Sequence, residues 1–208
     1  MTPAFNPPPA TAGHSGRWSA SWRGRVVLWI LAISLSVASG IFPAVAEEEI
    51  PVDFQVKAAF LINFPKYVDW PAGVFAETNS PLIVAVFGDE NVANEVQTMI
   101  GNGRTIGGHP LVLKRIDRAE EISRDCHILF IAAAERLRIP SILEKTRGGN
   151  ILTVSESDDF LEQDGIINLG RQGRKIRLQV NLAAAGKAQL KISSRLLVAA
   201  DVVKRKSN

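Results

Sequence analysis

Four short apolar runs, separated by stretches with helical periodicity, constrain the fold of this chain most strongly. They span residues 82–87, 111–116, 127–132 and 151–154 and are rich in β-branched and other apolar side chains. Continuous apolar runs of this length are typical of strands that are buried in a sheet. Because strands that alternate with helices form sheets covered by helices, the sequence predicts an α/β layered domain.

A hairpin near the carboxyl end should make this sheet mixed. Residues 166–169 and 175–182 are predicted to pair across the turn at 170–173, which begins and ends with glycine. The inward-facing side chains of the second strand would be Ile176, Leu178, Val180 and Leu182. Two terminal helical segments are expected after the hairpin, at 183–191 and 193–203.

The first helix is predicted from an apolar stripe over residues 56–68. Trp70 and Pro71 should end it, because the residue before a proline leaves the helical region. Pro65 lies within the stripe. It should kink the helix or stop it early, because proline removes a backbone hydrogen bond.

Further helices are expected between the strands. Asp89 should cap the helix after the first strand, and Gly101 should end it. The side chains that this helix turns to the core would be Val92, Val96, Met99 and Ile100. Other helical segments are predicted at 119–124, at 135–147 and, as a short piece, around Phe160.

The first 46 residues have the layout of a secretory signal peptide. Three arginines precede an apolar run at 26–37, and Ala44-Val45-Ala46 supplies the small residues that signal peptidase requires. Cleavage after Ala46 would leave residues 47–208 as a single domain without an internal repeat or linker. The alternative is an uncleaved membrane anchor over 26–42, although this run is short and contains serines.

Charge argues against a nucleic-acid partner. The 208 residues include 24 Lys and Arg and 21 Asp and Glu. Three of the arginines and none of the acids lie in residues 1–46, so 21 basic and 21 acidic residues remain after cleavage. The basic excess therefore belongs to the leader, and binding to nucleic acid is not expected.

Residues suited to catalysis or metal binding are few. Cys126 and His127 are neighbours on a predicted strand, so they face opposite sides of the sheet and cannot readily share a metal. His109 is the only other histidine after residue 46, and we expect both histidines to be structural or at the surface. No nucleophile elbow or Ser-x-x-Lys pair occurs after the leader. The sequence predicts no metal, no cofactor and no enzymatic activity.

Two features have both a structural and a functional interpretation. Cys126 has no partner for an intramolecular disulfide, and it is expected to be a buried thiol, the alternative being a reactive or intermolecular one. The acidic residues after the fourth strand lack the spacing of a calcium loop and should be solvated. They are Glu156, Asp158, Asp159, Glu162 and Asp164.

Several motifs follow one another in an order that resembles the YfiR/HmsC family of exported regulators. The series opens with Lys57-Ala58-Ala59-Phe60-Leu61, Asn63-Phe64, Lys66 and Trp70-Pro71. It continues at residues 86–89, 126–131, 151–154, 165–168, 180–182 and 192–197. The resemblance covers residues 56–200. Pro65 departs from it, since a helix former is usual at that position.

The resemblance implies a periplasmic protein that represses an inner-membrane diguanylate cyclase by binding the periplasmic sensor region of that enzyme. Repression would lower cyclic-di-GMP and biofilm formation. A sequestering outer-membrane lipoprotein and a second copy of the chain are further implied partners. The alternative function is a periplasmic small-ligand-binding module, with its ligand over the strand ends near Gly88, Asp89 and Ser155. An envelope hydrolase is a weaker third hypothesis.

Seven residues are candidates for contacts with a partner or ligand. They are Asn63, Lys66, Trp70, Asp89, Arg177, Ser193 and Ser194. Asp89 could hydrogen-bond a ligand, although helix capping already accounts for it. The two serines should cap the last helix while Leu196 and Leu197 pack inward.

Arg177 belongs to a basic group at the tip of the predicted hairpin, together with Arg171, Arg174 and Lys175. Such charges usually keep an edge strand soluble, and the alternative is that they face an acidic partner surface.

Overall fold

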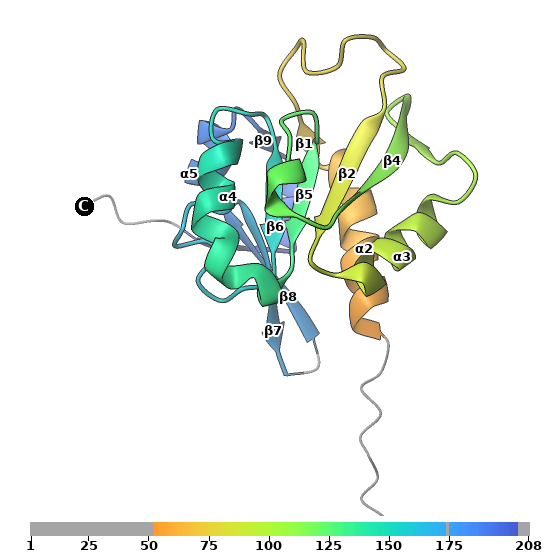
Figure 1. Cartoon of the computed structure of the whole chain (residues 1–208). Helices are drawn as coiled ribbons and strands as arrows, with labels where there is room; N and C mark the ends of the chain where they lie inside the picture. The colour runs from red at the N-terminus through yellow and green to blue at the C-terminus, as the bar shows by residue number, and fades with distance from the viewer. Residues whose placement is uncertain (1–51, 174, 204–208) are drawn as a thin grey trace, which may run out of the picture. The chain divides into compact units, whose positions relative to one another are not determined.

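The computed structural model describes residues 52–173 and 175–203 (Figure 1). The predicted signal peptide and Arg174 lie outside the described residues. In the described part of the chain, an eight-stranded sheet has the order β10-β8-β7-β6-β5-β2-β4-β3. Its strands are β2 (Leu82–Phe87), β3 (Thr105–Ile106), β4 (His109–Ile116), β5 (Ile128–Ile131), β6 (Leu152–Ser155), β7 (Ile167–Gln172), β8 (Lys175–Asn181) and β10 (Asp201–Val203).

This architecture confirms the predicted α/β fold with a mixed sheet. Strands β4, β2, β5, β6 and β7 run parallel, and β8 pairs antiparallel with β7 as the predicted hairpin. The first strand of the hairpin extends three residues further than expected, because Gln172 pairs with Lys175. The second strand, predicted at 175–182, ends at Asn181.

Alternating side chains of each strand enter cores on the two faces of the sheet. In β2, Val84 and Val86 pack with α2 (Val52–Asn63) and α3 (Glu90–Ile100), whereas Ala85 and Phe87 pack with α4 (Ile139–Thr146). Figure 1 shows α4 on one side of the sheet and the pair α2 and α3 on the other. Full burial of a valine or phenylalanine side chain contributes roughly 1.5–3 kcal/mol, so both layers stabilise the sheet.

The first helix ends early, as expected from Pro65. α2 stops at Asn63, and Phe64–Lys66 form a 3-10 turn that contains the proline. The prediction that the helical stripe continues to Val68 is wrong. Val68 lies in the short strand β1 (Val68–Asp69), which pairs antiparallel with β9 (Lys191–Ile192). The missing N–H of proline explains why the helix does not continue.

The helix after β2 forms as predicted. The Asp89 side chain accepts a hydrogen bond from the Val92 N–H at 3.0 Å, and Gly101 follows the last helical residue. Other helical segments are shorter than predicted. Only a 3-10 turn, Ala119–Glu121, forms in 119–124. The segment 135–147 begins as a 3-10 helix, Ala133–Arg138, and becomes α4 where Pro140 fits the first helical turn. Around Phe160 the chain makes turns and no helix.

The carboxyl-terminal segment also differs from the prediction. α5 (Leu182–Lys187) and α6 (Ser194–Val198) are short helices. The remainder of the predicted helical segments forms the strands β9 and β10 and turns at 188–190 and 199–200. Leu182 begins α5 and is exposed, so the prediction that it faces inward is wrong. Asp201, Val202 and Val203 form a strand that pairs parallel with β8, because valine favours the extended conformation of a strand.

Within residues 52–173 and 175–203, no helix has both the length and the apolar character that crossing a bilayer requires.

Candidate functional site

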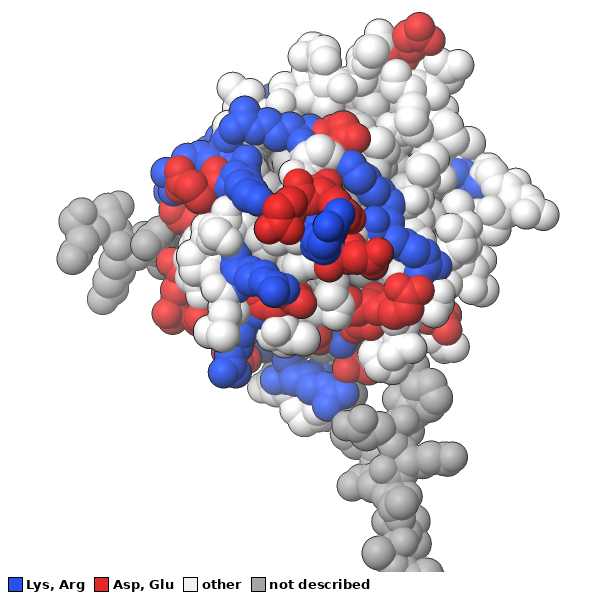
Figure 2. Space-filling model, in the orientation of Figure 1, with Lys and Arg blue, Asp and Glu red and all other residues white. Residues whose placement is uncertain are grey.

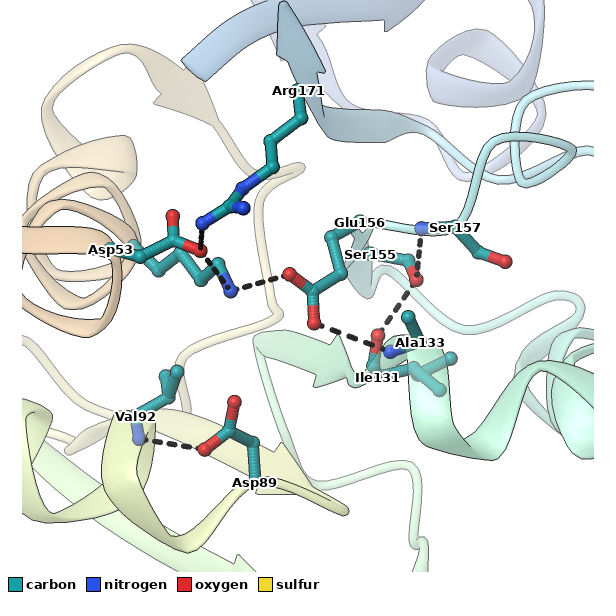
Figure 3. A network of polar contacts seen from close by, with 10 residues as sticks. Asp53, Asp89, Val92, Ile131, Ala133, Ser155, Glu156, Ser157 and Arg171 are labelled. Carbon is teal, nitrogen blue, oxygen red and sulfur yellow. Dashed lines mark hydrogen bonds and ion pairs between the residues drawn. The ribbon is translucent and has the colours of Figure 1, made fainter. Parts of the chain in front are cut away.

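A polar network lies where the parallel strands β5 and β6 end (Figure 3). Lys57 of α2 forms ion pairs with Glu156, which follows β6, and with Asp53 at 3.3 Å. Asp53 also pairs with Arg171 of the hairpin at 2.8 Å. Only 4% of Lys57 is exposed. A buried ammonium requires paired carboxylates, and here two segments distant in sequence supply them.

The protonation state of Lys57 is fixed by this pairing. Burial alone would lower the pKa of Lys57, but the hydrogen bond to Glu156 and the charges of Glu156 and Asp53 outweigh burial and raise that pKa. Lys57 therefore stays charged at neutral pH, and it serves as a fixed cation that joins α2 to the end of β6.

Backbone groups extend the network to the neighbouring strand. A carboxylate oxygen of Glu156 accepts a hydrogen bond from the Ala133 N–H at 3.4 Å. The Ser155 hydroxyl donates to the Ile131 carbonyl at 2.7 Å and accepts from the Ser157 N–H at 3.3 Å (Figure 3). Because the Ser155 proton is already donated to a carbonyl, this arrangement orders two loops and does not activate a nucleophile.

In open α/β sheets, ligands usually bind beside two neighbouring strands whose following connections lead toward opposite edges of the sheet. Here these two strands are β2 and β5. Gly88 follows β2 at that point, with φ +82°. A Cβ atom on Gly88 would lie 2.5 Å from Cγ of Glu135, so the Glu135 side chain covers this crevice. A cavity of about 250 Å³ lies beside it, lined by Asp89, Arg115 and Asp117 among others. Most small-ligand pockets are larger, at roughly 300–1,000 Å³.

Five of the seven predicted contact residues gather at the opposite end of the sheet, near the pair β1 and β9. The Asn63 side chain donates to the Ala59 carbonyl at 2.7 Å and accepts from the Lys66 ammonium at 2.8 Å. The Ser193 N–H donates to the Tyr67 carbonyl at 2.8 Å, which brings the start of α6 beside the residue that follows the 3-10 turn. Ser193 also caps α6, and its neighbour Ser194 is exposed.

Trp70 belongs to the same end of the molecule. Its indole N–H donates to the Asn150 carbonyl at 2.9 Å, and its ring meets Phe75 and His127 edge-on. The other two candidates do not join this group. Asp89 caps α3, and Arg177 pairs with Asp201 across β8 and β10. Leu196 is buried and Leu197 partly buried, as the capped helix predicts.

Sequence reasoning missed an aromatic stack beside Trp70. Phe75 lies between His109 and His127, with ring centroids 3.9 Å and 4.6 Å away. Nδ1 of His127 accepts the Ile83 N–H at 3.1 Å, and burial together with the charge of His109 lowers the pKa of His127. His127 is thus a structural histidine, as expected. No local pattern marks Phe75, because its partners are distant in sequence: His109 begins β4 and His127 lies directly before β5.

The acidic residues after β6 do not act as one group. Glu156 pairs with Lys57, Asp159 accepts hydrogen bonds from Ser157 and Gln163, and Asp164 pairs with Lys187 at 3.0 Å. In the part of the chain that the structure describes, no group of three or more His, Cys, Asp or Glu side chains could hold a metal ion. These acids instead order the loop.

Cys126 is buried, as predicted, and its thiol donates to the Ser123 carbonyl at 3.2 Å. Burial and the charge of Asp125 raise the pKa of the thiol to about 11. Because the thiolate is the reactive form, we expect the folded protein at pH 8 to react with a disulfide reagent at least about a hundredfold more slowly than the denatured protein. Release of thionitrobenzoate measures both rates, and equal rates would contradict a buried thiol.

Charged side chains are unevenly distributed over the face shown in Figure 2. Lys, Arg, Asp and Glu alternate over one part of this face, whereas the upper right is almost free of charge. Interspersed charges of both signs are typical of a solvated surface. This face therefore offers no large field of one sign.

A solved structure shares this fold. The crystal structure of a conserved domain protein from Vibrio cholerae O1 biovar El Tor superposes with a TM-score of 0.51 at 10% identity. The match covers 73% of this chain and 60% of that protein, so the likeness concerns the fold alone. No curated protein matches the sequence. The family model described as YfiR/HmsC-like matches residues 54–201, nearly the whole described domain, and the chain therefore belongs to the YfiR/HmsC-like family.

Proposed function

We propose that this protein is a periplasmic regulator that represses an inner-membrane diguanylate cyclase by binding the periplasmic sensor region of the cyclase. The observation that carries this proposal is the family match over residues 54–201. The secretory layout of residues 1–46 agrees with a periplasmic location. Repression lowers cyclic-di-GMP and thereby restrains biofilm formation. It requires only that the protein bind one state of the cyclase more tightly than the other.

The surface around β1 and β9 is the proposed contact region. It combines the exposed Lys66 and Ser194 with the half-buried Asn63, Trp70 and Ser193. The hydrogen bonds described above hold Asn63, Lys66, Trp70 and Ser193 in place. A binding surface whose side chains are already ordered loses less entropy on association. A sequestering outer-membrane lipoprotein would compete for this surface, and a second copy of the chain is a further proposed partner.

Deleting the gene should raise cellular cyclic-di-GMP several-fold, and the intact gene should restore the original level. A version that lacks residues 1–46 should fail to restore it, because the sensor region faces the periplasm. The double variant Lys66→Glu, Ser194→Glu should also fail, whereas Arg136→Glu on the exposed 3-10 helix before α4 serves as the matched control. Unchanged cyclic-di-GMP in the deletion strain under several envelope stresses would refute the repressor function.

One observation favours the alternative function, a periplasmic small-ligand-binding module. A groove of about 750 Å³ lies between α4 and α5, within the usual size of small-ligand pockets. Its apolar lining includes Leu143, Ile151 and Ile166, and it lies at the opposite end of the parallel strands from Asp89 and Ser155. Thermal stabilisation by a metabolite in a strain without a cyclase phenotype would support this alternative.

A further inference from the structure

Two histidines and two aromatic rings pack together at the amino ends of β4 and β5. Phe75 is stacked between His109 and His127, and the indole ring of Trp70 meets both Phe75 and His127 edge-on. Trp70 directly follows β1 and belongs to the proposed contact region around β1 and β9. A titratable side chain therefore supports the packing of a residue in that region.

The position of His127 requires a neutral imidazole. Only 8% of this residue is exposed, and its Nδ1 accepts the Ile83 N–H at 3.1 Å, so Nδ1 carries no proton. In the charged imidazolium both ring nitrogens are donors. Protonation therefore sets the Nδ1 proton against the Ile83 N–H and places a charge in a buried site. Both effects cost free energy unless the ring moves.

The charges around His127 come from several segments. Burial, followed by the charge of His109 on β4, lowers the pKa of His127, whereas the charge of Asp125 acts in the opposite direction and is the weaker influence. The other charged side chains on the segments that carry or adjoin these rings are Asp69, Glu77, Arg124, Arg147 and Lys191. The surroundings of the ring thus favour its neutral form.

The stack has space into which it can move. A cavity of about 190 Å³ lies beside it, lined by Asp69, Trp70, Phe75 and His109 among others. Trp70 and Phe75 belong to the segment 70–81, which consists of turns and bends between β1 and β2. These two rings can therefore shift without breaking a strand of the sheet.

We propose that His127 is an acid-sensitive switch, which on protonation releases the Ile83 N–H and loosens the packing of Trp70. The change reaches the surface around β1 and β9 and weakens its binding to a partner, a consequence that rests on the function proposed above. The stabilisation by the neutral ring is fully present above about pH 6.5, the ordinary pKa of histidine. It is lost as the pH falls from there through the lower pKa of the folded state.

Tryptophan fluorescence tests the switch, because Trp70 is the only tryptophan after residue 46. In the exported protein, its emission should change in one step between about pH 7 and pH 5. The step should be absent in His127→Asn, whose side-chain oxygen can accept the Ile83 N–H but does not titrate. His109→Asn is the matched control. It removes the charge that lowers the pKa of His127, so the step should remain and its midpoint should move to higher pH.

Nuclear magnetic resonance of the histidine rings gives a measurement on the parent protein that needs no variant. The pKa of His127 should lie below the value for histidine in the denatured protein, and its titration should coincide with the fluorescence step. A His127 pKa at or above the denatured-state value would overturn the proposal. A fluorescence step that persists unchanged in His127→Asn would overturn it as well.

Binding to the periplasmic region of the cyclase separates this switch from the repressor function. The affinity of the parent protein should fall at least about fivefold between pH 7.5 and pH 5.5, the lower range of coupling between two sites. The affinity of His127→Asn should be equal at both pH values. Equal affinities of the parent would overturn the link between the switch and the contact region. Absence of binding at either pH would refute the repressor function, and the fluorescence step would still decide whether His127 is a switch.

Discussion

Replacing Gly165 with alanine should lower the free energy of unfolding by about 3 kcal/mol, the upper range for overpacking a core. A Cβ atom at Gly165 would lie 2.4 Å from two ring carbons of Phe160 and 2.6 Å from a third. Phe160 is fully buried, and the Gly165 N–H donates to its carbonyl at 3.0 Å. The ring has no room to move, so the turn between β6 and β7 must deform.

Gly186→Ala is the matched control for this substitution. Gly186 lies in α5, and a Cβ atom there would meet nothing within 4 Å. We expect this alanine to stabilise the protein by roughly 0.5–1 kcal/mol, because alanine is the better helix former. Urea denaturation followed by circular dichroism measures both variants. Equal stability of the Gly165→Ala variant and the parent would show that the Phe160 ring is not closely packed.

Removing the Glu156 carboxylate should have a similarly large effect. We expect Glu156→Ala to lower the free energy of unfolding by about 3 kcal/mol, because it leaves the buried Lys57 ammonium with Asp53 as its only carboxylate partner. Arg171→Ala is the control, since it removes an exposed cation from Asp53 and should cost less than about 1 kcal/mol. Replacing Lys57 and Glu156 together by Met and Leu should recover most of the loss, because no buried charge then lacks its partner.

The dependence of this effect on pH follows from the raised pKa of Lys57. A group whose pKa is higher in the folded state stabilises that state fully below its unfolded pKa, which for lysine is about 10.4. The contribution is lost as the pH rises through the folded-state pKa. The destabilisation by Glu156→Ala should therefore be constant between pH 6 and 9 and become smaller above about pH 10.5. A large decrease near pH 7 would mean that Lys57 is neutral in the folded protein.

The strands were predictable because burial on both faces of a sheet requires continuous apolar runs. Leu82–Phe87 has the same bounds in sequence and structure, and the hairpin follows from alternation on either side of a glycine turn. The carboxyl-terminal elements were not predictable in the same way. The residues of β9 and β10 become strands only because β1 and β8 present free edges to them. Tertiary contact here overrides local helical preference.

The site residues likewise include some that the sequence predicted and some that depend on tertiary contact. The motif order pointed to Asn63, Lys66 and Ser193, and the structure places these three near the β1 and β9 pair. The pairing of Lys57 with Glu156 was not anticipated, because it depends on how α2 packs against the sheet. One signal was available, since Lys57 interrupts an apolar helical segment, and a charged residue in such a position needs a buried partner.

The pairing of β1 with β9 also bears on when the chain can fold. Val68, close to the beginning of the domain, finds its partner only in Ile192, close to the end. A ribosome or a translocation channel that delivers the chain from its amino end therefore releases nearly all of it before this contact can form. Contacts between residues so far apart in sequence slow folding. The pair of β1 and β9 is therefore expected to be among the last contacts to form, and it joins the two ends of the domain only when both are present.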